Sequence, residues 1–258
     1  MSAVQVDRSS GALRLTLNRP EALNALNNAC LETLLEQVQI ASVDPSVRVV
    51  VLQGQGPKAF CAGIDLAERE PMSAEEKGEQ SRRVVQVVTA LHGLAKPVIA
   101  AIGGWCLGAG LELALACDVR LAADDARFGF PEIKLGAYPG GGGAVLLPRV
   151  VGPCRAMEWL LSGRRLDAAE ALAMGLVSRV VPRTELEPST TALAHSVAAL
   201  APLAISALKT SMRITRDQPF DQAIQADQAL RRPLDATADY AEGLRAHREG
   251  RAPVFTGT

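Results

Sequence analysis

The first half of the chain alternates short apolar runs with longer segments in which apolar residues recur every three or four positions. The short runs predict strands, at residues 4–6, 13–17, 47–52, 98–102 and 119–122. The longer segments predict helices, at residues 23–40, 73–94 and 111–116. The run at 47–52 is nearly all β-branched, which predicts a strand buried on both faces. This alternation predicts βαβ units with a mostly parallel sheet, and therefore an α/β fold.

After a glycine run at 140–143 the spacing becomes mainly helical, with one strand predicted at 177–181. The helices are predicted at residues 157–161, 168–174, 186–200, 204–214, 222–230 and 236–249. We expect a core domain at residues 1–183 and a helical region at 184–258, which could pack on that core or on a neighbouring subunit.

One apolar segment, residues 97–117, is long enough to suggest a membrane span. It contains Glu112, and an acidic residue near a bilayer centre costs about 2.5–3.5 kcal/mol. It also contains several glycines, so we expect a buried strand, a glycine turn and a buried helix instead. Residues 1–8 are polar and do not resemble a signal peptide. These features predict a cytoplasmic protein with no membrane partner.

Composition excludes some classes of function. The 258 residues include 27 basic and 28 acidic side chains, a balance of −1 that argues against a nucleic-acid partner. The five cysteines are widely spaced without a CxxC motif, which is typical of a reduced chain. The three histidines lie far apart, so no metal site is expected. Only 3% of residues are aromatic, so the core should consist of Ala, Val and Leu.

Two glycine-containing segments could present backbone amides to a ligand. Residues 60–66 run from a strand into a small-residue turn, and such turns at the carboxyl edge of an α/β sheet often line a cleft. Residues 108–112 open a helix with two glycines, where free N–H groups and the helix dipole suit an anion or oxyanion. A plain strand-to-helix turn and tight strand–helix packing are the alternative interpretations.

Two carboxylates, Glu112 and Glu132, occur in strongly apolar segments. Burial raises the pKa of a carboxyl group toward neutrality, which suits a general acid or base. Alternatively, each could cap a turn or pair with an arginine such as Arg120 or Arg127. Cys61 could be a nucleophile, but no histidine is placed to act as its base, which favours a buried small residue.

Together these segments resemble the crotonase superfamily, also called the enoyl-CoA hydratase/isomerase family, through almost the whole chain. The matching segments are Leu17–Pro20, Leu23–Asn27, Phe60–Leu66, Lys96–Ala101, Gly108–Asp118, Phe128–Gly136, Pro139–Gly143, Gly163–Leu176 and Pro253–Phe255. The resemblance implies a crotonase-like spiral of ββα turns followed by a helical C-terminal trimerisation region. It also implies an acyl-CoA thioester ligand and a homotrimer or homohexamer.

The resemblance also implies roles for individual residues. The backbone amides of Ile64 and Ala109 would form an oxyanion hole. The residues implied to contact the acyl-CoA are Ala22, Leu23, Ala62, Gly63, Ile64, Asp65, Leu66, Trp105, Gly108, Ala109, Pro131, Tyr138 and Gly140.

Hydratases of this family use two glutamates, and Glu112 and Glu132 occupy the matching positions. The resemblance therefore implies hydration of a trans-2-enoyl-CoA to a 3-hydroxyacyl-CoA, with no cofactor besides the CoA carried by the substrate. The alternatives are a Δ3,Δ2-enoyl-CoA isomerase using Glu132 alone, and a non-catalytic paralogue that binds acyl-CoA or RNA.

Overall fold

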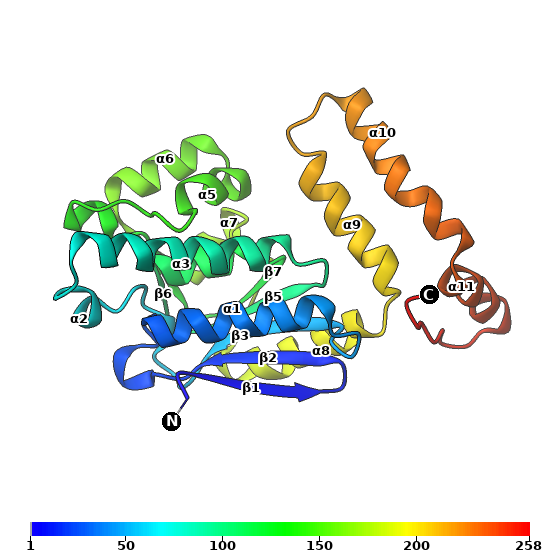
Figure 1. Cartoon of the computed structure of the whole chain (residues 1–258), viewed down its shortest axis with the longest axis horizontal. Helices are drawn as coiled ribbons and strands as arrows, with labels where there is room; N and C mark the ends of the chain where they lie inside the picture. Colours follow the sequence, from blue (N-terminus) through cyan, green and yellow to red (C-terminus); the bar gives the residue numbers. More distant parts are fainter. Residues whose placement is uncertain (1) are drawn as a thin grey trace.

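Two β-sheets and their covering helices form the core of the computed structural model, which describes residues 2–258 (Figure 1). The larger sheet has six strands in the order β1 (Val4–Ser9), β2 (Ala12–Leu17), β3 (Val49–Gly54), β5 (Val98–Ile102), β7 (Val119–Ala123) and β10 (Arg179–Val181). Its strands are parallel except for the β1–β2 pair. The predicted α/β class and mostly parallel sheet are therefore confirmed.

A second sheet has four strands in the order β4 (Ala59–Cys61), β6 (Trp105–Leu107), β8 (Arg127–Gly129) and β9 (Arg165–Asp167). Successive turns of the chain contribute one strand to each sheet and then a helix. For example, β5 and β6 are followed by α4, and β7 and β8 are followed, after a loop, by α5. This is the expected spiral of ββα turns. The pattern of apolar residues did not predict the second sheet as a unit, because its strands are only three residues long.

The helices of the core are α1 (Asn28–Val43), α2 (Leu66–Arg69), α3 (Ala74–Gly93), α4 (Ala109–Ala116), α5 (Gly143–Val151), α6 (Pro153–Ser162), α7 (Ala168–Ala173) and α8 (Leu186–Ala198). Helices α9 (Pro202–Ile214), α10 (Phe220–Arg231) and α11 (Ala238–Glu249) follow. Short 3-10 helices are η1 (Pro20–Ala22), η2 (Glu132–Leu135), η3 (Arg183–Glu185) and η4 (Arg232–Ala236).

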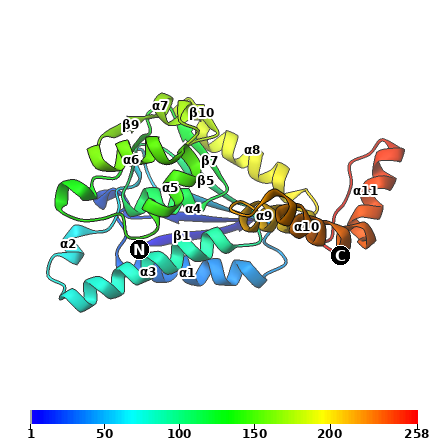
Figure 2. The same cartoon turned by 90° about the horizontal axis from the view of Figure 1, so that it is seen from above.

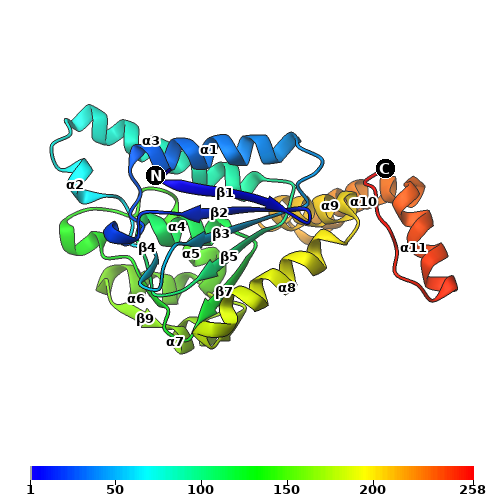
Figure 3. The same ribbon diagram turned by 90° about the horizontal axis from the view of Figure 1, so that it is seen from below.

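Strand β3 is buried on both faces, as its apolar run predicts. Val50 and Leu52 belong to the main core with side chains of α1 and α3. Val49 and Val51 instead pack with residues of α8, including Leu186. Figure 3 shows α1 and α3 on one side of the larger sheet and α8 on the other. Alternate residues of the strand therefore serve two separate apolar layers.

The helix predicted at 23–40 begins later, at Asn28. The Asn27 side chain accepts a hydrogen bond from the Cys30 amide and caps the helix. Leu23 and Asn24 have positive φ angles of 52° and 56°, which no right-handed helix allows. By contrast, the sequence signal at Ser73 and Glu76 is confirmed as a complete capping box at the start of α3.

The apolar segment 97–117 contains β5, a glycine turn, β6 and α4, in agreement with the sequence interpretation. Within residues 2–258 no single helix is long and apolar enough to cross a membrane. Within the same residues, one pair of consecutive helical segments, Arg183–Ala198 and Pro202–Ile214, would be long and apolar enough if the two were taken together, but the pair is bent by 105°.

Helices α9, α10 and α11 extend from one end of the layered core (Figures 1 and 2). Helix α8, the first helix after residue 184, packs on the larger sheet and belongs to the layered core. The boundary between residues 183 and 184 and the oligomerisation role of the C-terminal region stay predictions.

Candidate active site

Two loops bring the backbone amides of Ile64 and Ala109 close together. A Cβ atom added to Gly63, whose φ is +103°, would lie 3.7 Å from the Ala109 nitrogen. Leu26 donates to the Gly63 carbonyl at 2.7 Å and accepts from the Asp65 amide at 3.0 Å. Because neighbouring residues of an extended segment point their amides to opposite sides, the Ile64 amide points away from Leu26. Within residues 2–258 neither the Ile64 nor the Ala109 amide donates a hydrogen bond.

The two residues that flank Ala109, Gly108 and Gly110, must each be glycine for a different structural reason. Gly108 has φ of +50° and ψ of −125°, a conformation open only to glycine. Gly110 lies against β4, because a Cβ there would lie 2.5 Å from the Cys61 carbonyl oxygen. Tight packing, the alternative interpretation of this motif, therefore explains Gly110. The free first-turn amide of Ala109 is the feature suited to an oxyanion.

Glu112 lies in the first turn of α4 and is only 2% exposed. Its Oε1 accepts hydrogen bonds of 2.8 Å from the amides of both Gly141 and Gly143. Burial raises the pKa of Glu112, and the two amide hydrogen bonds oppose that rise. A carboxylate held in this way has a fixed orientation, and its Oε2 receives no hydrogen bond from residues 2–258.

Glu132 opens η2, and its side chain is half-buried. Its Oε2 is buried without a hydrogen-bond partner among residues 2–258. Burial raises the pKa of Glu132 to about 7, and the charge of Glu112 contributes further to the rise. A carboxyl group with this pKa exchanges protons readily near neutral pH.

Within residues 2–258 neither glutamate pairs with an arginine, so that alternative interpretation is not supported. The other alternative, that a glutamate caps a turn, fits Glu112 in part, because its Oε1 accepts the amides of Gly141 and Gly143. The Arg120 guanidinium donates to the carbonyl oxygens of Ala114, Cys117 and Leu176. Arg127 donates to the Ala126 carbonyl.

One cavity of about 190 Å³ contains both glutamates. Most residues implied to bind the acyl-CoA also line it, namely Ala62, Gly63, Ile64, Leu66, Gly108, Ala109, Pro131, Tyr138 and Gly140. Residues 2–258 show no group of three or more His, Cys, Asp or Glu side chains that could hold a metal ion.

Four implied binding residues lie outside this cavity. The Leu23 carbonyl accepts the Ala62 amide at 3.0 Å, and Ala22 belongs to the adjoining η1. Asp65 caps α2 through the amides of Ala67 and Glu68. Trp105 packs against Arg165, whose Cζ lies 4.7 Å from the centre of the Trp105 ring.

The cavity also has lining residues that the sequence reasoning did not single out as binding residues, namely Arg69, Ser81, Val84, Leu135, Ala137 and Gly141. Ser81 and Val84 lie three residues apart on α3, a spacing that signals a shared face but not what the face meets. No sequence signal marks Arg69.

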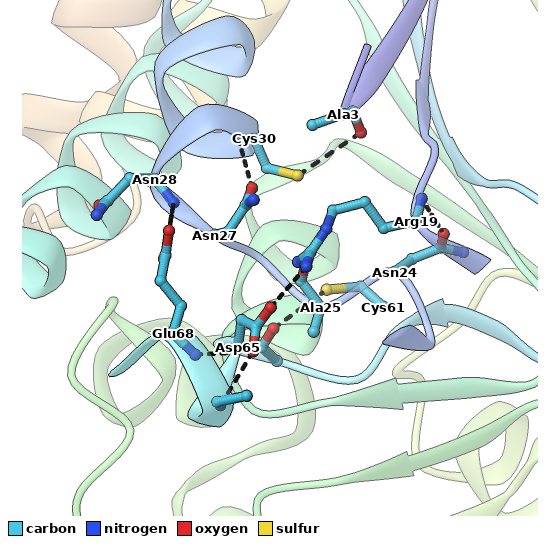
Figure 4. A network of polar contacts seen from close by, with 12 residues as sticks. Ala3, Arg19, Asn24, Ala25, Asn27, Asn28, Cys30, Cys61, Asp65 and Glu68 are labelled. Atoms are coloured by element: carbon cyan, nitrogen blue, oxygen red, sulfur yellow. Dashed lines mark hydrogen bonds and ion pairs between the residues drawn. The ribbon is translucent and has the colours of Figure 1, made fainter. Parts of the chain in front are cut away.

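A polar network holds the loop that contains Ile64 (Figure 4). Arg19 forms an ion pair of 2.7 Å with Asp65, and Asn24 donates to the Ala59 carbonyl at 2.7 Å. Glu68 accepts the Asn28 amide at 3.0 Å. Burial alone would raise the pKa of Asp65, but hydrogen bonds from Arg19 and the α2 amides outweigh burial and lower it. The network fixes both sides of Ile64 to the segment that precedes α1.

Cys61 lies behind this loop and is fully buried. Burial raises the pKa of its thiol to about 12, and the sulfur lies 3.8 Å from the Gly63 carbonyl oxygen. A thiol with this pKa stays protonated at neutral pH, which supports the interpretation of Cys61 as a packing residue.

Comparisons with known proteins agree on one family. A family model described as enoyl-CoA hydratase/isomerase matches residues 7–258. The chain is 40% identical over 257 residues to the 2,3-dehydroadipyl-CoA hydratase of Escherichia coli (strain K12), covering 100% of both chains. It is 38% identical over 254 residues to the (E)-benzylidenesuccinyl-CoA hydratase of Thauera aromatica, covering 98% of this chain and 99% of that one.

A solved structure gives the same result. The enoyl-CoA hydratase from Bacillus anthracis has a TM-score of 0.97 and 36% identity to this chain, covering 99% of this chain and 100% of that one. The similarity therefore extends over both sheets and the C-terminal helices.

Proposed function

Because the chain belongs to the enoyl-CoA hydratase/isomerase family, as its motifs predicted, we propose that it reversibly adds water to a trans-2-enoyl-CoA, giving a 3-hydroxyacyl-CoA. The observation that carries this proposal is the pair of carboxyl groups in one cavity. Glu112 and Glu132 both line it, burial raises the pKa of each, and neither forms an ion pair with an arginine of residues 2–258. A hydratase needs such a pair, because a proton must leave water and another must reach carbon.

The environments of the two groups suggest their roles. Glu112 would act ionised, since the Gly141 and Gly143 amides stabilise its charge. It holds a water molecule and takes a proton as the water oxygen bonds to C3. Glu132, with a pKa of about 7, would act protonated and transfer its proton to C2. Proton exchange with solvent then restores both groups, and the roles reverse in dehydration.

The amides of Ile64 and Ala109 would bind the thioester oxygen. Negative charge grows on this oxygen when water attacks C3, and two unpaired amides on adjacent loops stabilise it. Each such donor is worth about 3 kcal/mol of activation free energy. The residues that would act in this scheme are all side chains or amides of the protein, so we propose no cofactor beyond the CoA of the substrate.

The C-terminal helices support a proposed trimer or hexamer. Large apolar side chains on α9 and α10, namely Leu208, Met212 and Phe220, are 61%, 69% and 77% exposed in the single chain. Such exposure on adjacent helices is typical of an interface. Light scattering of the purified protein tests this proposal, and a monomer at micromolar concentration would contradict it.

The function itself is tested with purified protein and trans-2-enoyl-CoA substrates of increasing length. We expect loss of the enoyl absorbance and a product heavier by one water molecule, and the Glu112→Gln, Glu132→Gln double variant serves as the inactive control. Conversion of a 3-enoyl-CoA to a 2-enoyl-CoA without water addition would instead indicate an isomerase. Acyl-CoA binding without either reaction would indicate a binding protein.

A further inference from the structure

One positive charge lies in the wall of the cavity that contains the two glutamates. Arg69 ends α2, and its side chain lines this cavity beside Ser81 and Val84 of α3. It is the only cationic side chain among the described lining residues, most of which are apolar or glycine. A guanidinium in such a wall needs an explanation, because partial burial of an uncompensated charge is costly.

The hydrogen bonds of Arg69 leave part of the guanidinium free. Its Nη1 donates to the Lys77 carbonyl at 3.1 Å and to Gln80 Oε1 at 2.8 Å, and its Nη2 donates to Ser81 Oγ at 3.2 Å. All three acceptors are neutral. A guanidinium has five N–H groups, so its Nε and one N–H of Nη2 have no acceptor within residues 2–258.

No carboxylate of the described chain forms an ion pair with Arg69. Glu68 is connected to Arg69 only through Gln80. The Gln80 Nε2 donates to Glu68 Oε2 at 2.9 Å, and the Gln80 Oε1 accepts from Arg69. Gln80 is buried and joins the two charges through its amide. The free edge of the guanidinium therefore still lacks an anionic partner.

The position of Arg69 relative to the reacting atoms follows from α3. Val84 lies next to Glu112, because a Cβ added to Gly141 would overlap both side chains. Ser81 precedes Val84 by three residues, so their Cβ atoms are about 5–6 Å apart on one helix face. Arg69 donates to Ser81. Ser81 and Val84 therefore link the guanidinium, on the α2 side of the cavity, to the part of the cavity that contains Glu112.

We propose that Arg69 binds a carboxylate at the far end of the acyl chain, so that the preferred substrate is a short trans-2-enoyl-CoA with a second, free carboxyl group. This rests on the proposed function, in which C3 lies beside Glu112 and the rest of the acyl chain continues along α3. A guanidinium binds a carboxylate through paired, charge-assisted hydrogen bonds, and the free Nε and Nη2 groups lie on one edge suited to this. An uncharged chain of equal length leaves the cation without an anion.

The test compares two six-carbon substrates that differ only at the far end, trans-2-hexenedioyl-CoA and trans-2-hexenoyl-CoA. For the wild-type protein we expect kcat/KM at least about tenfold higher for the dicarboxylic substrate, as hydrogen bonds between charged groups allow. Arg69→Met should abolish this preference, and Arg69→Lys should restore part of it. Arg82→Gln, which removes an exposed arginine of α3, is the matched control and should leave the preference unchanged.

Binding of the saturated analogues, hexanedioyl-CoA and hexanoyl-CoA, is measured in parallel by calorimetry. If neither enoyl substrate is hydrated but hexanedioyl-CoA binds more tightly in an Arg69-dependent manner, the carboxylate subsite stands and the hydratase proposal fails. Equal losses for both substrates in Arg69→Met would overturn the subsite, because they indicate that Arg69 only joins α2 to α3 or binds the CoA phosphates. A wild-type protein that does not distinguish the two ligands would overturn it as well.

Discussion

The carboxylate of Glu132 lies directly over the α-carbon of Gly108, where an added Cβ would be 2.5 Å from Oε1. The same glycine precedes Ala109, whose amide is half of the proposed oxyanion hole. The loop that positions one donor for the thioester oxygen therefore also leaves the space in which the proposed acid lies. The proposed acid and the proposed oxyanion hole therefore meet at Gly108, a residue that has no side chain.

Replacing Gly108 by alanine should therefore affect catalysis strongly. The new methyl group overlaps Glu132, and the φ of +50° with ψ of −125° is strained for any residue except glycine. We expect kcat for hydration to fall by about a hundredfold or more, with a modest fall in melting temperature, measured by enoyl absorbance and thermal unfolding.

The matched control is Gly78→Ala. Gly78 lies on the exposed face of α3, and an added Cβ meets nothing within 4 Å. This change should raise the free energy of unfolding by about 0.5–1 kcal/mol without changing kcat. Equal activity of the two alanine variants would contradict the proposed coupling.

Glu112→Gln separates the charge of Glu112 from its place in the fold. The amide oxygen of glutamine can still accept from Gly141 and Gly143, so the loop at 140–143 should keep its position. The variant lacks the carboxylate that we propose as the base for water, and we expect kcat to fall by about a hundredfold or more. The affinity for a saturated acyl-CoA, measured by calorimetry, should change by less than about threefold. Hydration at the wild-type rate would rule out the mechanism with two glutamates.

Ala109→Pro tests the oxyanion hole without changing a side chain of the proposed acid–base pair. Proline is tolerated at the first helical position, so α4 should still form, but the amide of residue 109 loses its proton. We expect kcat/KM to fall about a hundredfold to a thousandfold. Ala109→Gly retains the amide and should keep activity within about tenfold. If both variants are equally impaired, the side chain matters and the amide does not.

The long elements of the fold could be predicted because each has a repeating apolar pattern. Strand β5 was placed at 98–102, and the capping box at Ser73 located the start of α3. The strands β6 and β8 could not be predicted in this way, since three residues are too few to show a period of two. The start of α1 was misplaced because helical spacing continues through Leu23, whereas the backbone there is left-handed.

The site was predictable where its residues are unusual for their surroundings. Glu112 and Glu132 were conspicuous as carboxylates in apolar segments, and the cavity contains both. Arg69 and Val84 belong to segments whose sequence resembles an ordinary helix surface. Only the packing of α2 against α3 brings them to the cavity, and that contact between elements has no local signature.

The ion pair between Arg19 and Asp65 should contribute to both stability and catalysis. The two side chains are 21% and 12% exposed, and Asp65 also caps α2. We expect Asp65→Ala to lower the free energy of unfolding by about 1–3 kcal/mol, and to lower kcat by loosening the segment around Ile64. Urea unfolding at fixed protein concentration measures the first effect. Asp217→Ala breaks an exposed pair with Arg149 and should change the free energy by less than about 0.5 kcal/mol.

The pKa of Glu132, about 7, predicts a limb near neutral pH in the rate of hydration. In the proposed mechanism hydration needs protonated Glu132, so its kcat/KM should fall about tenfold per pH unit above about pH 7. The kcat/KM of dehydration should show the same limb, because the reaction takes up no net proton and its equilibrium constant, which is the ratio of the two kcat/KM values, does not depend on pH. Glu132→Gln should lose this titration together with about a hundredfold of the rate. Glu75→Gln, an exposed change on α3, should retain it. A limb near pH 7 that persists in Glu132→Gln would assign the titration to another group.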